Sequence, residues 1–277
     1  MEFIQKTLED LKHNNCALDD NFFQAVKEVL ESIAPLIKSD EKYTKNSIIK
    51  QLVIPNKQIQ FKVCWFDDKG DVQVNSAYRI QFNNALGPYK GGLRFHPSVN
   101  SDILKFLAFE QIFKNSLTGL QIGGAKGGSD FNPKGKSDAE IMRFCKSFMI
   151  ELHKHIGARV DVPAGDIGVG AREIGYLFGA YKQLTSSYEG VLTGKPSFFG
   201  GSNMRPEATG YGVVYFTRKL LQVQNKQCFQ NQICTVSGSG NVAIFTIEKL
   251  TQLGALVVTC SDSKGSIYHK NGLDIEL

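Results

Sequence analysis

The feature that most constrains the fold is a short apolar segment near the end of the chain, followed by glycines and a helical pattern. Residues 232–236 read Gln-Ile-Cys-Thr-Val, which predicts a buried strand, and Ser-Gly-Ser-Gly-Asn-Val-Ala follows at 237–243. An apolar helix is expected to run to Leu253 with Gly254 as its cap, and Leu256–Cys260 predicts a second strand. This order is the βαβ fingerprint of dinucleotide binding, with alanine at the third glycine position.

Glycines in such a turn let backbone N–H groups reach a pyrophosphate at the N-terminus of a helix. A lone G-x-G-x-x-A is weak evidence. Here a strand, a helix, a second strand and an acid surround it, which favours a cofactor site over an ordinary strand–turn–helix. The predicted cofactor contacts in this turn are Gly238, Ser239, Gly240, Asn241 and Val242.

The end of the second strand bears on which nicotinamide cofactor binds. Asp262 is placed to accept a hydrogen bond from a ribose 2′-hydroxyl, which favours NAD. Ser261, Ser263 and Lys264 can instead donate to a 2′-phosphate, which favours NADP. The residues alone leave both cofactors open.

A lysine framed by small residues stands in the middle of the chain. Lys126 lies in Gly-Gly-Ala-Lys-Gly-Gly at 123–128, and an apolar run at 117–122 leads into it. Small neighbours let a substrate approach the ammonium closely. A lysine at the end of a buried strand is expected to have a depressed pKa, because desolvation and nearby cations disfavour its charged form, and it can then act as a base. The alternative is a flexible loop with a solvated lysine.

Two further motifs favour a site. Pro-Tyr-Lys-Gly-Gly-Leu-Arg-Phe at 88–95 places Lys90 beside paired glycines, and Asp-Val-Pro-Ala-Gly-Asp-Ile-Gly at 161–168 holds Asp166 in a tight turn. Two glycine-framed lysines and one aspartate predict a cationic pocket with a proton carrier, which suits an anionic substrate. By itself, Asp166 could equally cap the turn that follows it.

Together these three motifs resemble those of the glutamate dehydrogenase family of amino-acid dehydrogenases, and the resemblance runs from about Gln81 to Leu277. It implies reversible oxidative deamination of L-glutamate to 2-oxoglutarate and ammonium. It also implies NADP as cofactor, since Ser-Asp-Ser at 261–263 is similar to NADP-using members, with NAD as the alternative. A cytoplasmic homo-oligomer, a hexamer, that serves nitrogen assimilation is further implied.

The resemblance also assigns roles to individual residues. Lys126 matches the catalytic lysine that polarises the carbonyl, and Asp166 matches the residue that carries a proton to and from the amino nitrogen. The implied substrate contacts are Gln111 and Lys114 for the α-carboxylate, Lys90 for the side-chain carboxylate and the Gly165 carbonyl for the amino group. Gln111 and Lys114 are three residues apart and therefore share a helix face. The implied cofactor contacts include Thr209, Asn241, Asp262 and Ser263.

The predicted fold class is α/β. We expect an α/β substrate-binding and oligomerisation domain with a mixed sheet at 1–200, and the first part of a Rossmann dinucleotide-binding domain at 201–277. The boundary is the Gly/Pro-rich segment 190–201. Family members continue beyond Leu277, so the chain is expected to be a fragment or truncated product that is inactive by itself. The alternatives are a non-catalytic protein that keeps the fold and an anion-binding module without redox chemistry.

Local patterns predict the elements of the first domain. Helical periodicity covers 1–38, and alternation predicts strands at 47–64 and 71–82 with a hairpin turn at 67–70 and one apolar face along 72–80. Further helices are expected over about 101–117, 137–155, 173–184 and 206–221, with Asn100 or Ser101, Ser137 or Asp138 and Pro206 at their starts.

Composition excludes several classes of protein. The net charge is only +5 and no long block of like charge occurs, so nucleic-acid binding is not implied. No apolar run approaches the ~18 residues of a membrane span, and the N-terminus lacks a signal-peptide pattern. Six cysteines without a C-x-x-C pair predict reduced core thiols of a cytoplasmic protein. His153 and His155 point to different helix faces, so no metal site is expected.

Overall fold

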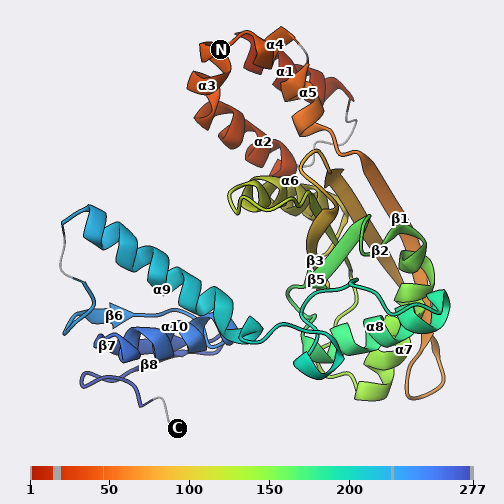
Figure 1. The fold of residues 1–277 in the computed structure, drawn as a ribbon. Helices are drawn as coiled ribbons and strands as arrows, with labels where there is room; N and C mark the ends of the chain where they lie inside the picture. Colours follow the sequence, from red (N-terminus) through yellow and green to blue (C-terminus); the bar gives the residue numbers. More distant parts are fainter. Residues whose placement is uncertain (1, 15–19, 46, 226–227, 275–277) are drawn as a thin grey trace. The chain divides into compact units, whose positions relative to one another are not determined.

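The computed structural model describes residues 2–14, 20–45, 47–225 and 228–274. The chain divides into two compact units, Met1–Gly201 and Ser202–Leu277. Each unit has its own sheet (Figure 1). The first unit has two apolar core clusters, and the second unit has one of its own. The predicted domain boundary, between residues 200 and 201, lies one residue before this division.

A five-stranded mixed sheet forms the centre of the first unit. Its strands are β1 (Lys57–Phe66), β2 (Val72–Asn83), β3 (Tyr89–Phe95), β4 (Gly124–Ser129) and β5 (Asp161–Gly165). They lie in the order β1-β2-β4-β3-β5. β2 pairs antiparallel with β1 and β4, whereas β3 runs parallel to both of its neighbours, β4 and β5. The predicted α/β class with a mixed sheet is confirmed, and the glycine–lysine segment is the middle strand.

Helices cover both faces of this sheet (Figure 1). α6 (Ser101–Ser116) packs on β2 and β4, and α2 (Asp20–Ser32) packs on α6. On the other face lie α7 (Asp138–Leu152), continued by the 3-10 turn η1 (His153–His155), and α8 (Ala171–Thr185). The remaining helices of this unit are α1 (Glu2–Asn14), α3 (Ala34–Ser39), α4 (Lys42–Lys45), α5 (Ile48–Val53) and the 3-10 turn η2 (Ser197–Phe199). The helical pattern predicted over 1–38 is thus confirmed for the described part of that range.

Aromatic side chains fill the core between the sheet and α7. Trp65, Phe95, Phe131, Phe144 and Phe148 are all buried there. The rings of Phe131 and Phe144 stack with centroids 3.8 Å apart, and Phe95 meets Phe144 edge to face at 5.1 Å. Each such ring contributes about 1.5–3 kcal/mol of transfer free energy, so this core fixes the sheet against α7.

Capping side chains set where two of these helices begin, as predicted. Asn100 Oδ1 accepts a hydrogen bond from the Ile103 N–H at 2.9 Å at the start of α6. At α7, Ser137 Oγ accepts from the Glu140 N–H at 3.1 Å, and the Ser137 N–H donates to Glu140 Oε2 at 3.0 Å. This reciprocal capping box satisfies N–H groups that the first turn of a helix leaves unpaired.

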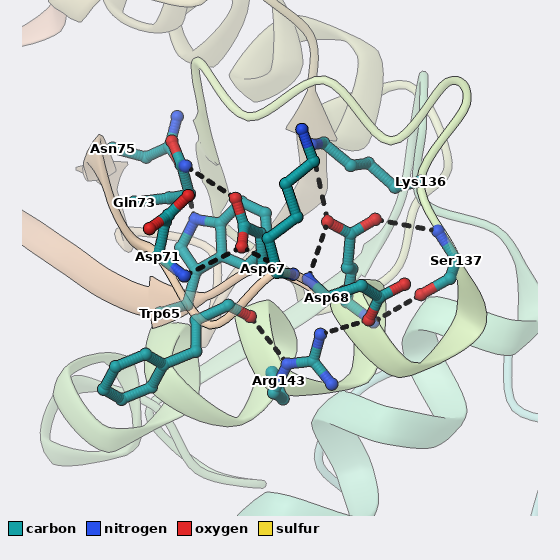
Figure 2. Close-up of polar contacts among 12 residues, drawn as sticks. Trp65, Asp67, Asp68, Asp71, Gln73, Asn75, Lys136, Ser137 and Arg143 are labelled. Atoms are coloured by element: carbon teal, nitrogen blue, oxygen red, sulfur yellow. Dashed lines mark hydrogen bonds and ion pairs between the residues drawn. The ribbon is translucent and has the colours of Figure 1, made fainter.

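The predicted hairpin turn joins β1 to β2 and is tied to α7. Asp67 Oδ1 accepts from the backbone N–H groups of Lys69 and Asp71 at 2.9 and 3.0 Å. Figure 2 shows that Arg143 of α7 reaches this turn: its Nη2 lies 2.5 Å from Asp68 Oδ1, and its Nε donates to the Phe66 carbonyl at 2.6 Å. Hydrogen bonds within the turn and contacts from Arg143 of α7 therefore both stabilise its conformation.

Two local predictions for this unit are wrong. Residues 48–53 form helix α5 instead of the first part of a strand, and β1 begins only at Lys57. The run 117–122 is no buried lead-in strand, since Leu117 is 88% exposed and the strand begins at Gly124. The face of β2 predicted to be apolar is exposed at its start, where Val72 and Val74 are 60% and 63% exposed, and is buried at Ile80.

The second unit is smaller. It contains α9 (Arg205–Val223), β6 (Ile233–Thr235), α10 (Asn241–Gln252), β7 (Leu256–Ser261) and β8 (Ser266–Tyr268). β6 and β7 are parallel, β8 is antiparallel to β7, and α9 packs against α10. The strand–turn–helix–strand order is confirmed, and Pro206 lies in the first turn of α9 as expected. The first strand is not buried as predicted: Ile233 at this sheet edge is 71% exposed.

The cysteine prediction is only partly confirmed. The five cysteines among the described residues are free thiols, and Cys145 is buried in the α7 core. Cys228, Cys234 and Cys260 are half-buried and pack against the core of the second unit, whereas Cys64 is exposed on β1 and does not fit the prediction. Cys16 lies outside the described residues. Within the described ranges, no helix is both long enough and apolar enough to cross a bilayer.

Candidate active site

The site is built on the α6-facing side of the sheet, where three strands bring charged residues together. Lys126 is the third residue of β4 and lies opposite Ile80 of β2, whose side chain packs in the α6 core. The Lys126 side chain is buried, at 8% exposure, so the predicted alternative of a solvated loop lysine is wrong. Asp166 directly follows β5.

Glycines on the neighbouring strands make room for this lysine. A Cβ atom added to Gly92 of β3 would lie 2.8 Å from the Cβ of Asp166 and 3.4 Å from Lys126 Nζ. A Cβ atom on Gly124 would lie 2.3 Å from Cγ2 of Ile112 in α6. The glycine-rich segment is therefore a strand that packs closely against α6. The strand can approach the helix and the neighbouring strands this closely because glycine has no side chain.

The Lys126 ammonium and the Asp166 carboxylate form an ion pair. Lys126 Nζ lies 3.1 Å from Asp166 Oδ1, and Arg94 Nε of β3 donates to Asp166 Oδ2 at 2.7 Å. The carboxylate thus has one cation at each oxygen. Both partners of the Arg94–Asp166 pair are mostly shielded, at 18% and 23% side-chain exposure, so water weakens these contacts less than at an open surface.

Burial and charge shift the pKa values of both reactive groups. Burial lowers the pKa of Lys126 below its ordinary value of 10.5; the Asp166 charge opposes this, and Arg94 and Lys114 add to it. Burial by itself raises the pKa of Asp166, but Lys126 and Arg94 outweigh burial and bring that pKa below its ordinary 3.8. The site therefore holds an ionised carboxylate beside a lysine whose proton is less tightly bound than usual.

Helix α6 supplies the next group of polar residues. Gln111 Nε2 donates to Asn115 Oδ1 at 2.8 Å, and the buried Asn115 amide donates to the carbonyls of Lys90 at 3.1 Å and Gly123 at 2.5 Å. Asn115 thereby orients Gln111 and ties α6 to the starts of β3 and β4. Lys114 is exposed on this helix and lies close enough for its charge to act on Lys126.

The remaining predicted substrate contacts lie on β3 and β5. Lys90 Nζ of β3 donates to Thr193 Oγ1 at 2.7 Å. Gly165 closes β5 opposite Leu93, and its carbonyl oxygen would lie 2.9 Å from a Cβ atom on Gly92. The structure therefore brings Lys126, Asp166 and Gly165 together around Gly92. Lys90 and Gly92 share one face of β3, since side chains alternate along a strand.

Three residues of this group were not predicted from the sequence: Arg94, Asn115 and Thr193. Arg94 could have been predicted, because Lys90, Gly92 and Arg94 are two residues apart along a strand and therefore share one face of it. No local pattern distinguishes Asn115 from a surface asparagine or Thr193 from a loop threonine. Both contact Lys90 of β3, which lies 25 residues from Asn115 and 103 residues from Thr193 in the sequence.

A buried ion pair supports the strands from the opposite face. Arg79 of β2 binds Asp161 of β5 through Nε–Oδ2 at 2.9 Å and Nη2–Oδ1 at 2.5 Å, and both side chains are fully buried. Gln81 Nε2 also donates to Asp161 Oδ2, and Arg79 Nη1 donates to the Gly91 carbonyl at 3.2 Å. The pair thus links β2, β3 and β5 beneath the site.

In the second unit, the glycine turn fits a dinucleotide phosphate. Gly238 has φ of 105°, and a Cβ atom there would lie 3.3 Å from the Cβ of Ala243, which explains the glycine and the alanine of the motif. Gly240 is the N-cap of α10, and no side chain caps the N-terminal N–H groups of that helix. Such N–H groups are a ready anion site, so Gly238–Val242 suit the pyrophosphate.

The other predicted cofactor residues surround this turn. Ser261 Oγ accepts from the Gly238 N–H at 2.9 Å, which joins the turn to the end of β7. Asp262 Oδ1 accepts from the N–H groups of Lys264 and Gly265 at 2.7 and 3.0 Å, so it shapes the loop that carries the exposed Ser263. Thr209 is exposed on α9, next to a glycine at which a Cβ atom would lie 2.8 Å from the Val242 carbonyl oxygen. Among the described residues no cluster of three or more His, Cys, Asp or Glu is arranged to hold a metal.

Two family models match successive parts of this chain. Residues 55–183 match the dimerisation domain of Glu/Leu/Phe/Val dehydrogenases, and residues 200–277 match the Glutamate/Leucine/Phenylalanine/Valine dehydrogenase model. The chain belongs to the Glu/Leu/Phe/Val dehydrogenase family. The three sequence motifs therefore led to the right family.

Individual members of this dehydrogenase family are closely similar to the chain. The NADP-specific glutamate dehydrogenase of Helicobacter pylori is 58% identical over 275 residues, which are 99% of this chain and 61% of that protein. The NADP-specific enzyme of Haemophilus influenzae is 58% identical over 92% of this chain and 57% of its own length. A solved glutamate dehydrogenase of Plasmodium falciparum superposes with a TM-score of 0.95 at 54% identity, over 99% of this chain and 58% of that one. The chain thus spans about three fifths of the length of these relatives.

Proposed function

We propose that this chain serves in a glutamate dehydrogenase that catalyses the reversible oxidative deamination of L-glutamate to 2-oxoglutarate and ammonium. The observation that carries the proposal is the ion pair between Lys126 and Asp166, 3.1 Å apart on a sheet face that also carries Lys90. The relatives support it, since those at 58% identity are named NADP-specific glutamate dehydrogenases.

The proposed roles follow from the geometry of the charged groups. The Lys126 ammonium donates a hydrogen bond to the carbonyl oxygen of 2-oxoglutarate and so favours attack at that carbon. In the deamination direction, the Asp166 carboxylate accepts a proton from the substrate ammonium, which leaves a neutral amine and a carboxylic acid. The Gly165 carbonyl oxygen, beside Asp166, is placed to accept a hydrogen bond from the same nitrogen.

Substrate carboxylates are assigned to the cations around this pair. Gln111 and Lys114 of α6 would hold the α-carboxylate, with Gln111 oriented by Asn115. Lys90, already hydrogen-bonded to Thr193, would hold the side-chain carboxylate. Several cations in one pocket attract a dianion and penalise a substrate with only one carboxylate.

NADP is the proposed cofactor, and it supplies the hydride chemistry when bound. The turn Gly238–Val242 would hold its pyrophosphate, with Thr209 as a further contact. Asp262 and Ser263 are assigned to the adenosine ribose, where Ser263 can donate to a 2′-phosphate. Asp262 accepts its two backbone hydrogen bonds through Oδ1, so this geometry does not separate the two cofactors. The choice of NADP over NAD is supported by the relatives, which are named NADP-specific glutamate dehydrogenases.

A homo-oligomer, specifically a hexamer, is also proposed. The first matching model is described as a dimerisation domain. β1 lies at the edge of its sheet, and Phe66, Val72 and Val74 beside it are 57–63% exposed, which is typical of a surface that another chain covers. Mass measurement in solution tests this, with Val74→Lys expected to lower the assembled fraction. Cytoplasmic location and a role in nitrogen assimilation belong to the same proposal.

Because the chain by itself is expected to be inactive, the function is tested in a protein that also supplies the rest of its relatives' length. Oxidation of NADPH is followed by its absorbance, with 2-oxoglutarate and ammonium present together and separately. Turnover that needs both substrates and disappears in Lys126→Ala supports the proposal. Binding of 2-oxoglutarate without any turnover would favour an anion-binding module. Binding of neither 2-oxoglutarate nor NADPH would favour a non-catalytic protein that keeps the fold.

A further inference from the structure

The Asp166 carboxylate is held by two cations from two different strands. Arg94 Nε of β3 donates to Oδ2 at 2.7 Å, while Lys126 Nζ of β4 lies 3.1 Å from Oδ1. Arg94 therefore occupies the oxygen that Lys126 does not use. We propose that Arg94 is a positioning residue that keeps Asp166 ionised and directs its other oxygen toward Lys126. This inference rests on the dehydrogenase function proposed above.

The backbone around Arg94 fixes the distance between the two side chains. Arg94 lies opposite Gly128 in the β3–β4 register, and a Cβ atom on Gly128 would lie 2.1 Å from the Arg94 carbonyl oxygen. On the other side, the Phe95 N–H donates to the Ile167 carbonyl at 2.9 Å, directly after Asp166. The strand that carries Arg94 is thus clamped to the loop that carries Asp166.

The charges that face the pair explain what Arg94 adds. Asp166 faces Lys126 and Arg94, and Lys126 faces Asp166 and Arg94, with Lys114 and Glu110 of α6 near enough to interact with it. Arg94 lowers the pKa of Asp166 and also that of Lys126 through its charge. Arg94 thereby favours the ionised form of Asp166 and makes it easier for Lys126 to lose its proton.

The test compares Arg94→Gln and Arg94→Lys with the unchanged chain and with Arg159→Gln, an exposed arginine next to β5. In protein labelled with ¹³C at the aspartate carboxyl and lysine Cε positions, NMR titration follows Asp166 and Lys126 directly. We expect Arg94→Gln to raise the pKa of Asp166 by about one pH unit or more, and to raise that of Lys126 as well. Arg94→Lys keeps the charge and should shift both less, and Arg159→Gln should shift neither.

A folded Arg94→Gln variant whose two titration curves coincide with those of the unchanged chain would overturn the inference. If that variant does not fold, Arg94→Lys decides: an unchanged Asp166 titration together with unchanged activity would also overturn it. These titrations need no turnover, so they remain informative if the proposed dehydrogenase activity fails its own test.

Kinetics of the active enzyme separate positioning from substrate binding. Because Arg94 binds Asp166, we expect Arg94→Lys to lower kcat by about ten- to a hundredfold while KM for glutamate changes little. The fall in kcat should persist at neutral pH, where Asp166 is ionised in both proteins, because it comes from a displaced carboxylate. A raised KM with unchanged kcat would instead make Arg94 a substrate-binding group and contradict the proposed role.

Discussion

A side chain at Gly92 would collide with Asp166, because an added Cβ atom would lie 2.8 Å from the Cβ of Asp166. The same atom would lie 2.9 Å from the Gly165 carbonyl oxygen and 3.4 Å from Lys126 Nζ. Because Gly92 has no side chain, Asp166 after β5 can contact Lys126 of β4 across strand β3, which lies between them.

Gly92→Ala should separate Lys126 from Asp166. We expect a loss of about 1–3 kcal/mol in the free energy of unfolding, typical of overpacking, together with a lower kcat. Urea denaturation and steady-state kinetics measure the two effects. Gly179→Ala is the matched control: no atom lies within 4 Å of its Cβ position on α8, so it should be neutral or stabilising. Equal effects of both substitutions would contradict this account.

In an enzyme of its relatives' full length, Lys126→Ala should abolish turnover and leave NADPH binding nearly unchanged. The lysine lies in the first unit, whereas the phosphate-binding turn Gly238–Val242 lies in the second. The measurements are kcat and a fluorescence titration with NADPH. A kcat close to that of the unchanged enzyme would show that Lys126 has no catalytic role, and a loss of cofactor binding alone would give it a different one.

Lys90→Leu should reduce the preference for a second carboxylate. A charge-assisted hydrogen bond from Lys90 to the substrate is worth roughly 1.5–3 kcal/mol. Its loss should lower kcat/KM for glutamate by about ten- to a hundredfold, since 1.4 kcal/mol corresponds to a factor of ten. Norvaline, which lacks that carboxylate, should be affected far less. Lys146→Leu, at an exposed position of α7, serves as the control. An unchanged ratio between the two substrates would show that Lys90 does not recognise the side chain.

Two aspartates paired with arginines should differ in their importance for stability. Asp161→Asn leaves the fully buried Arg79 without its counter-ion, which costs about 3–5 kcal/mol. Asp138→Asn removes a partner of Arg172 at the surface, where the two side chains are 72% and 47% exposed, and should cost at most about 1 kcal/mol. Chemical denaturation of both variants checks this. Similar losses would mean that burial does not set the strength of these pairs.

We expect acid to lower the free energy of unfolding of the first unit, because Asp166 becomes protonated. Its folded pKa is lowered below the ordinary 3.8, so the carboxylate contributes stability above about that pH and loses the contribution as pH falls through the folded pKa. We therefore expect Asp166→Asn to be less stable than the unchanged chain at pH 5, with a difference that shrinks as the solution is acidified. Urea denaturation at several pH values measures it, and a constant difference would argue against an ionised Asp166 in the fold.

Much of this architecture was predictable because the signals are local. Asn100 and Ser137 cap helices through bonds to residues three positions away, and the turn at 67–70 closes on itself. The glycine turn before α10 likewise follows from neighbouring residues, since Gly238 needs a positive φ. Where the local pattern was ambiguous, as at 48–53 and 117–122, the predictions failed.

The family, the βαβ turn and the glycine-framed lysine with its candidate partner Asp166 could all be inferred from the residues. The three-dimensional packing was needed to show that the glycine–lysine segment is the middle strand of a sheet, and that Arg94, Asn115 and Thr193 join the site. Caps and turns depend on atoms within a few residues, whereas strand order depends on packing both sheet faces against helices. Residues such as Arg94 and Asp166 become neighbours only when that order places β3 between β4 and β5.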